Sequence, residues 1–513
     1  MKSTLVVICL VPVLSMIAAN VSPAADRLQW GEALSRNMVS HEKGLPDGFD
    51  PGQRDAAGNI DVATTENVRW TARLGNTTYG SPTVAGGRVF IGTNNEMPRD
   101  PRCQGDRGVL MCFDEKTGEF LWQLVVPKFY KIKWADWRLC GVSSTPTVEG
   151  ERLYLMSNRC EVMCLDVQGM ANGNDGPFTD EGRHTAPADE PALKPGPKDA
   201  DIVWIYDLNE ELGVAPHNAA NCSVLLHGDL LYVCTCNGVD WTHKFVINPK
   251  APSVIVLNKQ TGKLVARDDF GIGPDITHGQ WTSPSMGEVD GKMLAFHGSG
   301  DNWLYAYEAL DPKQLGDGPV KLKNVFKFNG HPAAQTQDYP APDHQHDSTS
   351  YEVTAMPVFH NGRVYVPFTQ EPFHRMKEGW LACIDASKTG DVTRSALVWK
   401  YDALGSSAST PAIADGLVYA VDFLQGKLHC IDAETGKCYW IHDVGRNTCG
   451  SPLVADGKVY LGTGMQLFWV LAAGKELKVL NRIRMLNSIN STPTAANGVL
   501  YVATDRHLYA VGK

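Results

Sequence analysis

Eight stretches of the chain repeat one short frame, and this repeat constrains the fold more than any other feature. The frame is a proline, a short apolar run, a turn that contains glycine, and an aromatic residue eight positions after the proline. Two copies are degenerate: Val224 replaces the proline before Tyr232, and Pro284 begins a longer version that reaches Phe296. The six regular copies are Pro82 with Phe90, Pro146 with Tyr154, Pro357 with Tyr365, Pro411 with Tyr419, Pro452 with Tyr460 and Pro493 with Tyr501.

The second half of the frame also recurs. A short apolar run that ends in aspartate, such as Leu110–Asp114 or Leu428–Asp432, is followed by a Thr-Gly turn and then by tryptophan. Alternating apolar residues between tight turns of this kind are typical of antiparallel strands. Four such strands in a copy of about 41 residues form one propeller blade. The sequence therefore predicts an all-β fold, an eight-bladed β-propeller of four-stranded antiparallel blades.

The two ends of the repeat region complement each other. The last copy ends at Leu508–Val511 without a fourth strand, whereas Asn67–Ala72 looks like a fourth strand without the other three. Pairing these segments would remove an open sheet edge, which is prone to aggregation. We expect the N-terminal strand to close the C-terminal blade, so that the propeller spans residues 67–513.

The first residues have the pattern of a secretory leader. Lys2, an apolar run from Leu5 to Ala19, and small residues up to Ala25 are typical of a signal peptide. The apolar run is shorter than the roughly 20 residues that span a bilayer, so no membrane anchor is expected. We expect residues 1–25 to be removed, residues 26–66 to form an N-terminal extension, and the mature chain to be periplasmic or secreted.

Charge and cysteine content narrow the function further. The net charge is −10 and lysine and arginine form no run, so the chain is not expected to bind nucleic acid. An exported chain meets oxidising conditions. Four cysteines share one strand position and are expected to be buried thiols, namely Cys112, Cys164, Cys383 and Cys430. The others are expected to pair as disulfides in an order left open, namely Cys103, Cys140, Cys160, Cys222, Cys234 and Cys236, with Cys438 and Cys449 as a further candidate pair.

The repeat carries a family resemblance. The phrase Asp-x-x-Thr-Gly-x-x-x-Trp, as in Asp114–Trp122 and Asp432–Trp440, resembles the tryptophan-docking repeat of PQQ-like (quinoprotein-type) β-propellers. The chain looks like a secreted bacterial member of that family. The resemblance implies that tryptophans at one repeat position pack against the next blade and hold the ring together. The matching residues are Trp70, Trp122, Trp204, Trp399 and Trp440, with Phe326 as a stand-in.

Long insertions gather on one face of the predicted propeller. Turns within the first and the last strand pair of a blade lie on one face, and the remaining connections lie on the other. Most insertions fall in the second class, which marks a binding face. They are 93–108, 127–145, 207–221, 234–253, 271–283, 329–356 and 367–380. One insertion on the opposite face, 167–202, is rich in proline, glycine and aspartate and is expected to be a flexible excursion.

Aromatic and polar side chains are concentrated on this loop-rich face, where they suit a flat or carbohydrate-like ligand. For any one tryptophan, the alternative is that it packs its loop onto the blade. His297 and Asp301 could form an acid–base pair, although a structural role is favoured. The candidate ligand-binding residues are Trp134, Trp137, Arg138, His217, Trp241, His278, Trp281, His297, Asp301, Trp303 and Trp380.

A short histidine motif is the candidate metal site. In an extended segment, alternating residues point to the same side, so His344 and His346 could chelate a transition metal, with Asp347 beside them. A structural metal site needs three or four ligands, and a solvated polar loop is the alternative.

The resemblance implies two classes of function, because PQQ-like propellers include PQQ- and calcium-dependent dehydrogenases and also scaffolds without activity. The chain has no adjacent cysteine pair and no Cys-x-x-Cys-His haem motif. We therefore favour a ligand-binding or protein-interaction scaffold whose partner is a small molecule, a carbohydrate or a protein. The alternative is a PQQ- and calcium-dependent dehydrogenase that oxidises an alcohol or a sugar.

Overall fold

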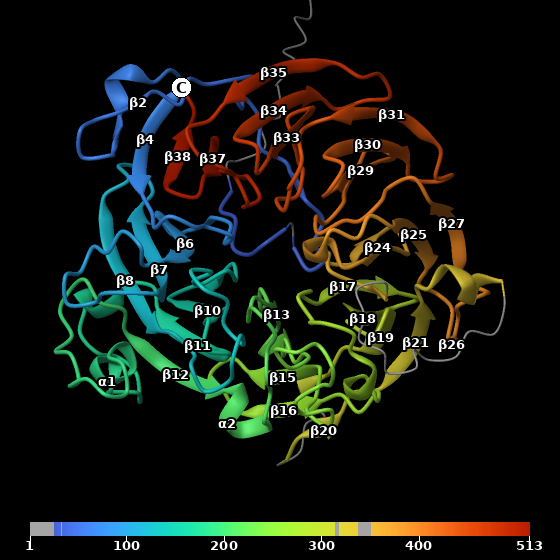
Figure 1. Ribbon diagram of the computed structural model, residues 1–513, viewed down its shortest axis with the longest axis horizontal. Helices are drawn as coiled ribbons and strands as arrows, with labels where there is room; N and C mark the ends of the chain where they lie inside the picture. The colour runs from blue at the N-terminus through green and yellow to red at the C-terminus, as the bar shows by residue number, and fades with distance from the viewer. Residues whose placement is uncertain (1–24, 32, 313–317, 337–349) are drawn as a thin grey trace, which may run out of the picture.

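Each repeat folds into one sheet of four antiparallel strands, and eight such sheets are arranged around a central axis (Figure 1). The computed structural model describes residues 25–31, 33–312, 318–336 and 350–513. The signal peptide predicted at residues 1–25 therefore lies, apart from Ala25, outside the described residues. In the described part of the chain, no helix is both long and apolar enough to cross a membrane.

In blades 1 to 7 the strands follow chain order from the axis outward. Blades 1 to 4 consist of β5 (Thr83–Ala85), β6 (Arg88–Asn94), β7 (Arg107–Asp114) and β8 (Phe120–Pro127); β9 (Thr147–Glu149), β10 (Arg152–Met156), β11 (Glu161–Asp166) and β12 (Ile202–Asp207); β13 (Leu225–His227), β14 (Leu230–Cys234), β15 (Val254–Asn258) and β16 (Leu264–Arg267); and β17 (Ser285–Val289), β18 (Lys292–Gly298), β19 (Trp303–Glu308) and β21 (Asn324–Asn329).

Blades 5 to 7 repeat this arrangement, and blade 8 takes its outer strand from the N-terminal part of the chain. They consist of β23 (Val358–His360), β24 (Arg363–Gln370), β25 (Gly379–Asp385) and β27 (Leu397–Tyr401); β28 (Ala412–Ala414), β29 (Leu417–Asp422), β30 (Lys427–Asp432) and β31 (Cys438–Asp443); β32 (Leu453–Ala455), β33 (Lys458–Gly462), β34 (Leu467–Ala472) and β35 (Val479–Arg484); and β36 (Thr494–Ala496), β37 (Val499–Ala503), β38 (His507–Val511) and β4 (Val68–Arg73).

Short elements complete the described chain. The strands are β1 (Val39–Ser40), β2 (Gln53–Arg54), β3 (Ile60–Asp61), β20 (Val320–Lys321), β22 (Tyr351–Glu352) and β26 (Gly390–Asp391); the helical turns are η1 (Val62–Thr64), η2 (Gly169–Ala171), α1 (Glu181–Thr185), α2 (Leu208–Leu212), η3 (Gly273–Asp275), η5 (Pro332–Gln335) and η6 (Pro372–His374).

The N-terminal strand closes the ring as predicted. β4 pairs antiparallel with β38, with Trp70 opposite Ala510 and Ala72 opposite Leu508. Because the partners lie more than 400 positions apart in the sequence, this sheet joins the two ends of the propeller. The predicted eight-bladed fold and its mode of closure are both confirmed.

The docking tryptophans occupy the predicted position on the outermost strands. Each indole N–H donates to a main-chain carbonyl of the next blade, as in Trp70 to Glu115 at 2.8 Å and Trp122 to Val167 at 3.0 Å. A Cβ atom at Gly118 would lie 2.6 Å from the Trp70 ring, so only glycine lets the indole lie this close. Trp204, Trp399 and Trp440 donate in the same way, to Lys259, Ala433 and Gly474.

Blade 4 is joined to blade 5 differently. Phe326 stands where five other blades have tryptophan, and it is fully buried but has no N–H to donate. Blades 3 and 7 have Ala266 and Asn481 at this position. Instead β26, from the last loop of blade 5, pairs in parallel with β21, the outer strand of blade 4. Main-chain pairing at the rim thus takes the place of the indole hydrogen bond.

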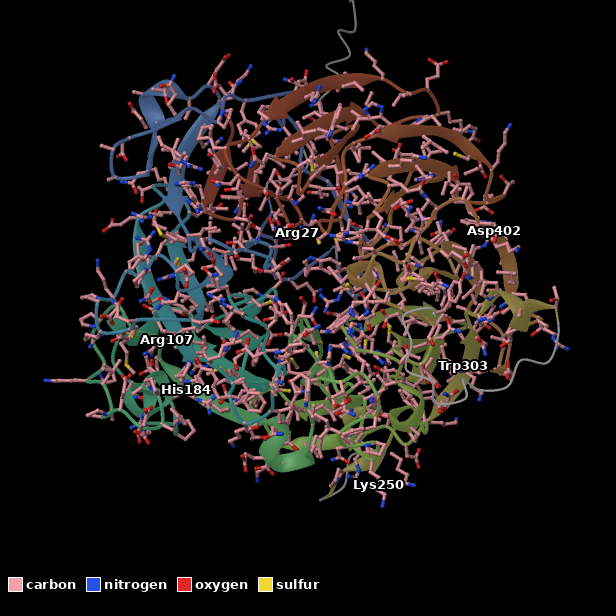
Figure 2. All side chains as sticks on the ribbon, viewed as in Figure 1. Arg27, Arg107, His184, Lys250, Trp303 and Asp402 are labelled. Carbon is pink, nitrogen blue, oxygen red and sulfur yellow. The ribbon has the colours of Figure 1, made fainter. Side chains whose placement is uncertain are left out.

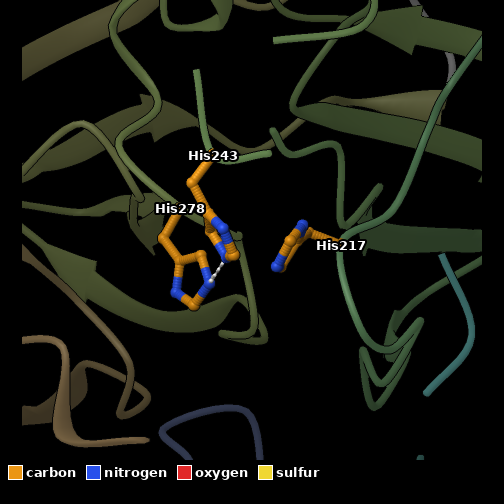
Figure 3. A group of neighbouring side chains, drawn as sticks. All are labelled: His217, His243 and His278. Carbon is orange, nitrogen blue, oxygen red and sulfur yellow. Dashed lines mark hydrogen bonds between the residues drawn. The ribbon is translucent and has the colours of Figure 1, made fainter. Parts of the chain in front are cut away.

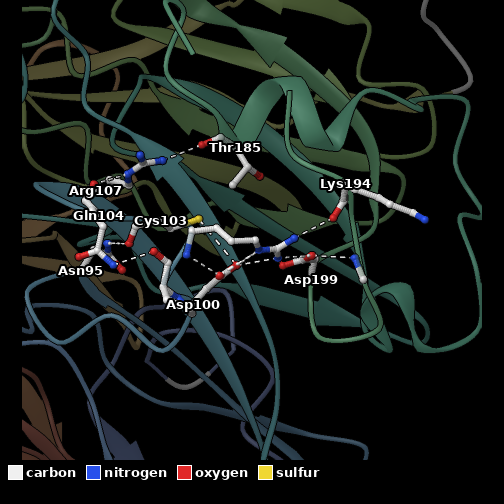
Figure 4. Close-up of polar contacts among 11 residues, drawn as sticks. Asn95, Asp100, Cys103, Gln104, Arg107, Thr185, Lys194 and Asp199 are labelled. Carbon is white, nitrogen blue, oxygen red and sulfur yellow. Dashed lines mark hydrogen bonds and ion pairs between the residues drawn. The ribbon is translucent and has the colours of Figure 1, made fainter. Parts of the chain in front are cut away.

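The 167–202 insertion, expected to be a flexible excursion, is anchored to blade 1 (Figure 4). Arg107 donates to the carbonyl of Thr185 at 2.9 Å, at the end of α1. Arg102 donates to the carbonyl of Lys194 at 2.8 Å and contacts Asp199 at 3.2 Å. These bonds join segments that are distant in the sequence and hold the insertion against its neighbour.

The N-terminal extension closes one end of the central channel. Residues 25–31 and 33–45, here called the axial segment, cross the middle of the ring, where Figure 2 labels Arg27. Main-chain hydrogen bonds join this segment to the innermost strands of five blades, through Val84, Val148, Met286, Phe359 and Val454. It also bonds the tight turns at Gly86 and Gly498, which lie on the face opposite the long insertions.

Arg36 fastens the axial segment from inside. Its side chain is fully buried and donates to three main-chain carbonyls, those of Trp30, Ser223 and Pro284, at 2.8, 2.6 and 3.0 Å. Because these acceptors lie on the segment itself and before blades 3 and 4, one guanidinium ties the segment to the ring. Burying a charged guanidinium is costly unless its N–H groups are hydrogen-bonded, and these three carbonyls supply the acceptors.

The expected disulfides are not present in the described chain, where all twelve cysteines are free thiols. Cys112, Cys164, Cys383 and Cys430 are buried on their strands, as predicted. Cys160, Cys222, Cys234 and Cys236 were expected to pair, but they pack into one apolar cluster between blades 2 and 3. There Cys160 and Cys234 direct their Sγ atoms to the carbonyls of Thr235 and Gln280. These four thiols therefore act as small core residues, as the four strand cysteines do.

Candidate functional site

The long insertions converge on a cavity of about 470 Å³ at the axis of the ring. Its lining comes from almost every blade, which places it on the axis and not between two blades. Six of the seven insertions predicted to form the binding face contribute to it. The lining residues are Trp30, Tyr79, Ser81, Trp134, Trp137, Cys140, Ser143, Thr145, His217, Asn218, Ala219, Asn221, Ser223, His243, His278, Trp281, Thr354, Met356, Phe373, His374, Ala408, Thr410, Cys449, Ser451, Asn490 and Thr492.

A ring of hydroxyl groups forms the inner rim of the cavity. The residue two positions before the first strand of a blade is serine or threonine in seven blades, and its hydroxyl accepts a hydrogen bond from the main-chain N–H of the equivalent residue in the preceding blade. All these bonds run in one rotational sense, at 2.8 to 3.1 Å. The donor–acceptor pairs are Ser81–Thr145, Thr145–Ser223, Ser223–Ser283, Met356–Thr410, Thr410–Ser451, Ser451–Thr492 and Thr492–Ser81.

The hydroxyl ring is interrupted once. Met356 stands before blade 5 where the other blades have a hydroxyl, so no such acceptor is present between blades 4 and 5. Below the ring, Trp30 of the axial segment reaches the cavity. The channel is therefore a pocket with one open end, on the loop-rich face.

Aromatic rings form the wall and mouth of the cavity. Trp134 and Trp137 pack edge to face with centroids 5.6 Å apart, and they remain 42% and 48% exposed. Deeper in the cavity, Trp281 packs edge to face against Phe373 and donates its indole N–H to the carbonyl of His217 at 2.9 Å. The mouth therefore presents exposed indole surface, while the inner wall is fixed by hydrogen bonding.

Three histidines from separate insertions meet in the wall, as Figure 3 shows. The ring centroids of His217, His243 and His278 lie 4.5 to 4.9 Å apart. Gly238 permits this approach, because a Cβ atom there would lie 2.8 Å from the His217 Cβ and 2.9 Å from the His278 carbonyl oxygen. Asp240 holds the turn that carries His243, accepting from the N–H of Lys244 at 3.0 Å.

Each of the three imidazoles keeps a nitrogen facing the others. His217 donates Nδ1–H to the carbonyl of Val239 at 3.0 Å, and its buried Nε2 has no partner among the described residues. The Nε2 atoms of His243 and His278 lie 3.1 Å apart. Burial, together with His278, lowers the pKa of His217 to about 3, and the same causes lower the pKa of His243. Neutral rings with free lone pairs are the form that binds metal ions.

A pair of buried carboxyl groups stands behind His278. Its Nδ1 lies 2.5 Å from Glu371 Oε2, and Glu371 also accepts from the N–H of Phe373 at 2.7 Å, which caps η6. Burial raises the pKa of Glu352 well above its usual range, and the charge of Glu371 adds to this. Burial opposes the ionisation of Glu371 too, but its interactions with neighbouring Glu352 and with His278 prevail and lower its pKa to about 2. Glu371 is therefore the ionised partner that orients His278.

Two cysteines line the cavity without being reactive. Burial raises the pKa of Cys140 and of Cys449 to about 12. At neutral pH both stay protonated, and the thiolate is the nucleophilic form. They act as small apolar wall residues.

The structure brings five of the predicted ligand-binding residues into the lining: Trp134, Trp137, His217, His278 and Trp281. Trp241 lies beside the mouth, where it packs edge to face against Trp134 and carries the Lys133 ammonium 3.5 Å above its ring. Arg138 is exposed and outside the lining.

The remaining predicted residues lie away from the cavity. His297 is fully buried and contacts Gln280 and Thr282, whereas Asp301 accepts from the Tyr305 hydroxyl at 2.6 Å. Because His297 and Asp301 form hydrogen bonds with different residues, a structural role is favoured over an acid–base pair. Trp303 lies in the outer part of blade 4 beneath the Lys327 ammonium (Figure 2), and Trp380 is buried against Phe368 in blade 5. His344, His346 and Asp347, the candidate metal ligands, lie outside the described residues.

The described lining does not fit PQQ with calcium. PQQ carries three carboxylates, and calcium binds six to eight oxygen atoms, usually including carboxylates. Among its described residues the lining contains no lysine, arginine, aspartate or glutamate. Glu371 is bonded to His278 behind the wall, and Glu352 lies beside these two residues. The donor set suits imidazole chemistry and neutral ligands instead.

Comparison with known proteins identifies the repeat. A family model described as outer membrane protein assembly factor BamB matches residues 59–171 and 377–479. A europium-containing methanol dehydrogenase superposes with a TM-score of 0.58 and 12% identity, over 94% of this chain and 89% of that one. BamB from Moraxella catarrhalis gives 0.49 and 11%, over 87% and 99%. At 12% identity the likeness to the methanol dehydrogenase shows the propeller fold alone. No curated protein matches the chain.

Proposed function

Because the chain belongs to the PQQ-like β-propeller repeat family, we propose that it is a ligand-binding scaffold, exported from the cell, that takes a neutral small molecule into the axial cavity. The observation that carries this proposal is the composition of the cavity: indole and phenyl rings at the mouth and wall, hydroxyls at the rim, and no charged side chain in the described lining.

The cavity chemistry favours a ligand with a flat apolar face and several hydroxyl groups. The exposed indoles of Trp134 and Trp137 offer stacking surface at the entrance. Stacking on an aromatic face suits both pyranose sugars and aromatic rings. The serine, threonine and asparagine side chains deeper in the cavity supply donors and acceptors that fix orientation. A neutral sugar or sugar derivative satisfies both sets of groups.

Titration of the purified chain with neutral monosaccharides, oligosaccharides and aromatic compounds tests this function through intrinsic tryptophan fluorescence. We expect saturable binding at micromolar to millimolar concentration by at least one neutral sugar. Trp137→Ala, an exposed cavity residue, should weaken binding at least tenfold. Trp303→Ala, half-buried on blade 4 and outside the cavity, is the matched control and should bind like the natural chain.

Two results would overturn the proposal. One is silence of the whole panel at millimolar concentration. The other is binding that Trp303→Ala abolishes and Trp137→Ala leaves unchanged, because the ligand would then lie outside the axial cavity.

A further inference from the structure

We propose that His217, His243 and His278 bind a divalent transition metal ion in the wall of the axial cavity, with one coordination position open toward the cavity. Nε2 atoms from three insertions converge there, and one ligand atom from each residue lies within 4.8 Å of the others. This site goes beyond the proposed function, because the ion needs no organic ligand to bind.

The Nε2 atoms of His278 and His243 face each other and share one hydrogen bond. A metal ion bound between them would take the place of the shared proton, which moves to Nδ1 of His243 or to solvent. When the Glu371 carboxyl group accepts from Nδ1 of His278, that nitrogen carries the proton and Nε2 keeps its lone pair, which accepts from Nε2–H of His243. Nε2 of His243 lies 3.1 Å away. Two imidazole ligands on one tetrahedral zinc ion, at bonds of about 2.0–2.1 Å, would be about 3.3 Å apart. The observed separation is thus already close to that of a bound pair.

His217 supplies the third donor, and its Nε2 nitrogen is the strongest evidence that an ion binds here. Its ring is 1% exposed, and its Nδ1–H is committed to the carbonyl of Val239. Nε2 is therefore a buried acceptor without a partner among the described residues, which costs about 1–3 kcal/mol unless something binds there. An ion between the three rings would satisfy it.

The surroundings match those of metal-binding histidines in general. Such histidines give their second nitrogen to a carboxylate or a carbonyl, as His278 gives to Glu371 and His217 to Val239. His243 has a positive φ of 59°, as do the lining residues Trp134 and Asn218 at 66° and 63°. Non-glycine residues in this region are strained and concentrate at functional sites.

Imidazole donors select the chemical class of the ion. Three histidine ligands suit zinc, copper, nickel or cobalt, whereas calcium and magnesium require oxygen ligands. His374 lines the cavity beside the site, with its ring 4.9 Å from that of His278. Three protein ligands and a free position are typical of sites that bind or polarise a ligand. The free position would receive a donor atom of the cavity's occupant.

The test is metal titration of tag-free protein stripped with a chelator, with no organic ligand present. We expect one Co²⁺ per chain, with the intense visible absorption of tetrahedral cobalt, and displacement by Zn²⁺ followed by calorimetry. His243→Ala, in a half-buried loop position, should weaken binding roughly 100-fold, and His217→Gln should do the same. Glu371→Gln, which removes the charge that orients His278, should weaken it about 10- to 100-fold.

Two control variants separate this site from other histidines. His227→Ala changes a half-buried histidine of the β13–β14 hairpin on the opposite face, and it should bind Co²⁺ like the natural chain. The double variant His344→Ala/His346→Ala should also bind normally. The proposal is overturned if the stripped protein takes up no stoichiometric Co²⁺, if the double variant loses it, or if His243→Ala and His217→Gln bind unchanged. Because no sugar is present, failure here leaves the proposed function untouched.

Discussion

Replacing Arg36 should release the axial segment and show how much one buried guanidinium stabilises the propeller. Arg36→Met keeps the length of the side chain but removes all three donors to Trp30, Ser223 and Pro284. Each buried carbonyl left without a donor costs about 1–3 kcal/mol, so the loss is about 6 kcal/mol in total.

Part of this loss is offset. Burial lowers the pKa of Arg36 from 12.5 to about 10, which corresponds to about 3 kcal/mol against the charged form. Methionine carries no charge, so this cost disappears and the net destabilisation should be about 3 kcal/mol. Arg36→Lys keeps the charge and its burial cost while losing two of the three bonds, about 4 kcal/mol. The conservative replacement should therefore be at least as harmful as the apolar one.

Urea unfolding followed by tryptophan fluorescence measures both effects, and limited proteolysis shows whether the axial segment is released. Arg102→Met is the control, because Arg102 is 42% exposed and its ion pairs with Asp100 and Asp199 should contribute less than about 1 kcal/mol. The reasoning is refuted if Arg36→Met unfolds at the same urea concentration as the natural chain, or if Arg36→Lys is clearly milder than Arg36→Met.

Three further predictions concern stability. Trp122→Ala should destabilise the chain by about 3–5 kcal/mol, because this 1%-exposed indole fills the joint between two blades; a shift below 1 kcal/mol in urea unfolding would contradict the docking role. A chain that begins at Leu74 lacks β4 and should aggregate on size-exclusion chromatography, whereas one that begins at Asp26 should stay monodisperse. Burial lowers the pKa of His297 to about 3 and of His429 and His507 to about 4, from 6.5. The unfolded chain takes up these protons first, so stability should fall as pH drops from 6.5 to about 4, by about 1.4 kcal/mol per pH unit for each group, and His297→Gln should reduce the slope measured by urea unfolding at several pH values.

The fold could be predicted because its signal is local and repeated. Every blade carries its own turn glycine and apolar alternation, and most also carry a docking aromatic residue, so eight weak signals reinforce one another. Even the closure was visible, because Asn67–Ala72 has the pattern of a blade strand. The axial segment carries no repeat, and nothing in residues 26–45 indicates that Arg36 would be buried against carbonyls from distant blades.

The candidate site could be predicted only as a face. Loop length and aromatic content pointed to the correct insertions, and Trp134, Trp137 and Trp281 do line the cavity. The histidine cluster was missed because its members come from three insertions, and only the curvature of the ring brings them together. His344 and His346 attracted the metal hypothesis because adjacency is visible in a sequence. One signal went unused: the serine or threonine before the frame proline, present at Ser81 and its equivalents, marks the cavity rim.

The disulfide prediction failed for a related reason. Compartment and cysteine count argue for pairing in general, but they say nothing about where each sulfur lies. Cys222, Cys234 and Cys236 share an apolar cluster in which each thiol fills space against its neighbours. From the sequence alone, cysteines that pack in a core cannot be distinguished from cysteines that form a disulfide, because only the folded blades show where each sulfur atom lies.

The propeller is closed in one blade, but its hydroxyl ring is broken at a different joint, between blades 4 and 5. Blade 8 contains both ends of the propeller, yet its rim bonds to blades 7 and 1 are complete. Between blades 4 and 5 the inner bond is missing at Met356, while β26 and β21 stay paired at the outer edge. The joint between blades 4 and 5 is thus held at its outer edge and lacks one hydrogen bond near the axis. We therefore expect any widening of the axial cavity to begin at this joint, beside the insertion that carries Glu371 and His374.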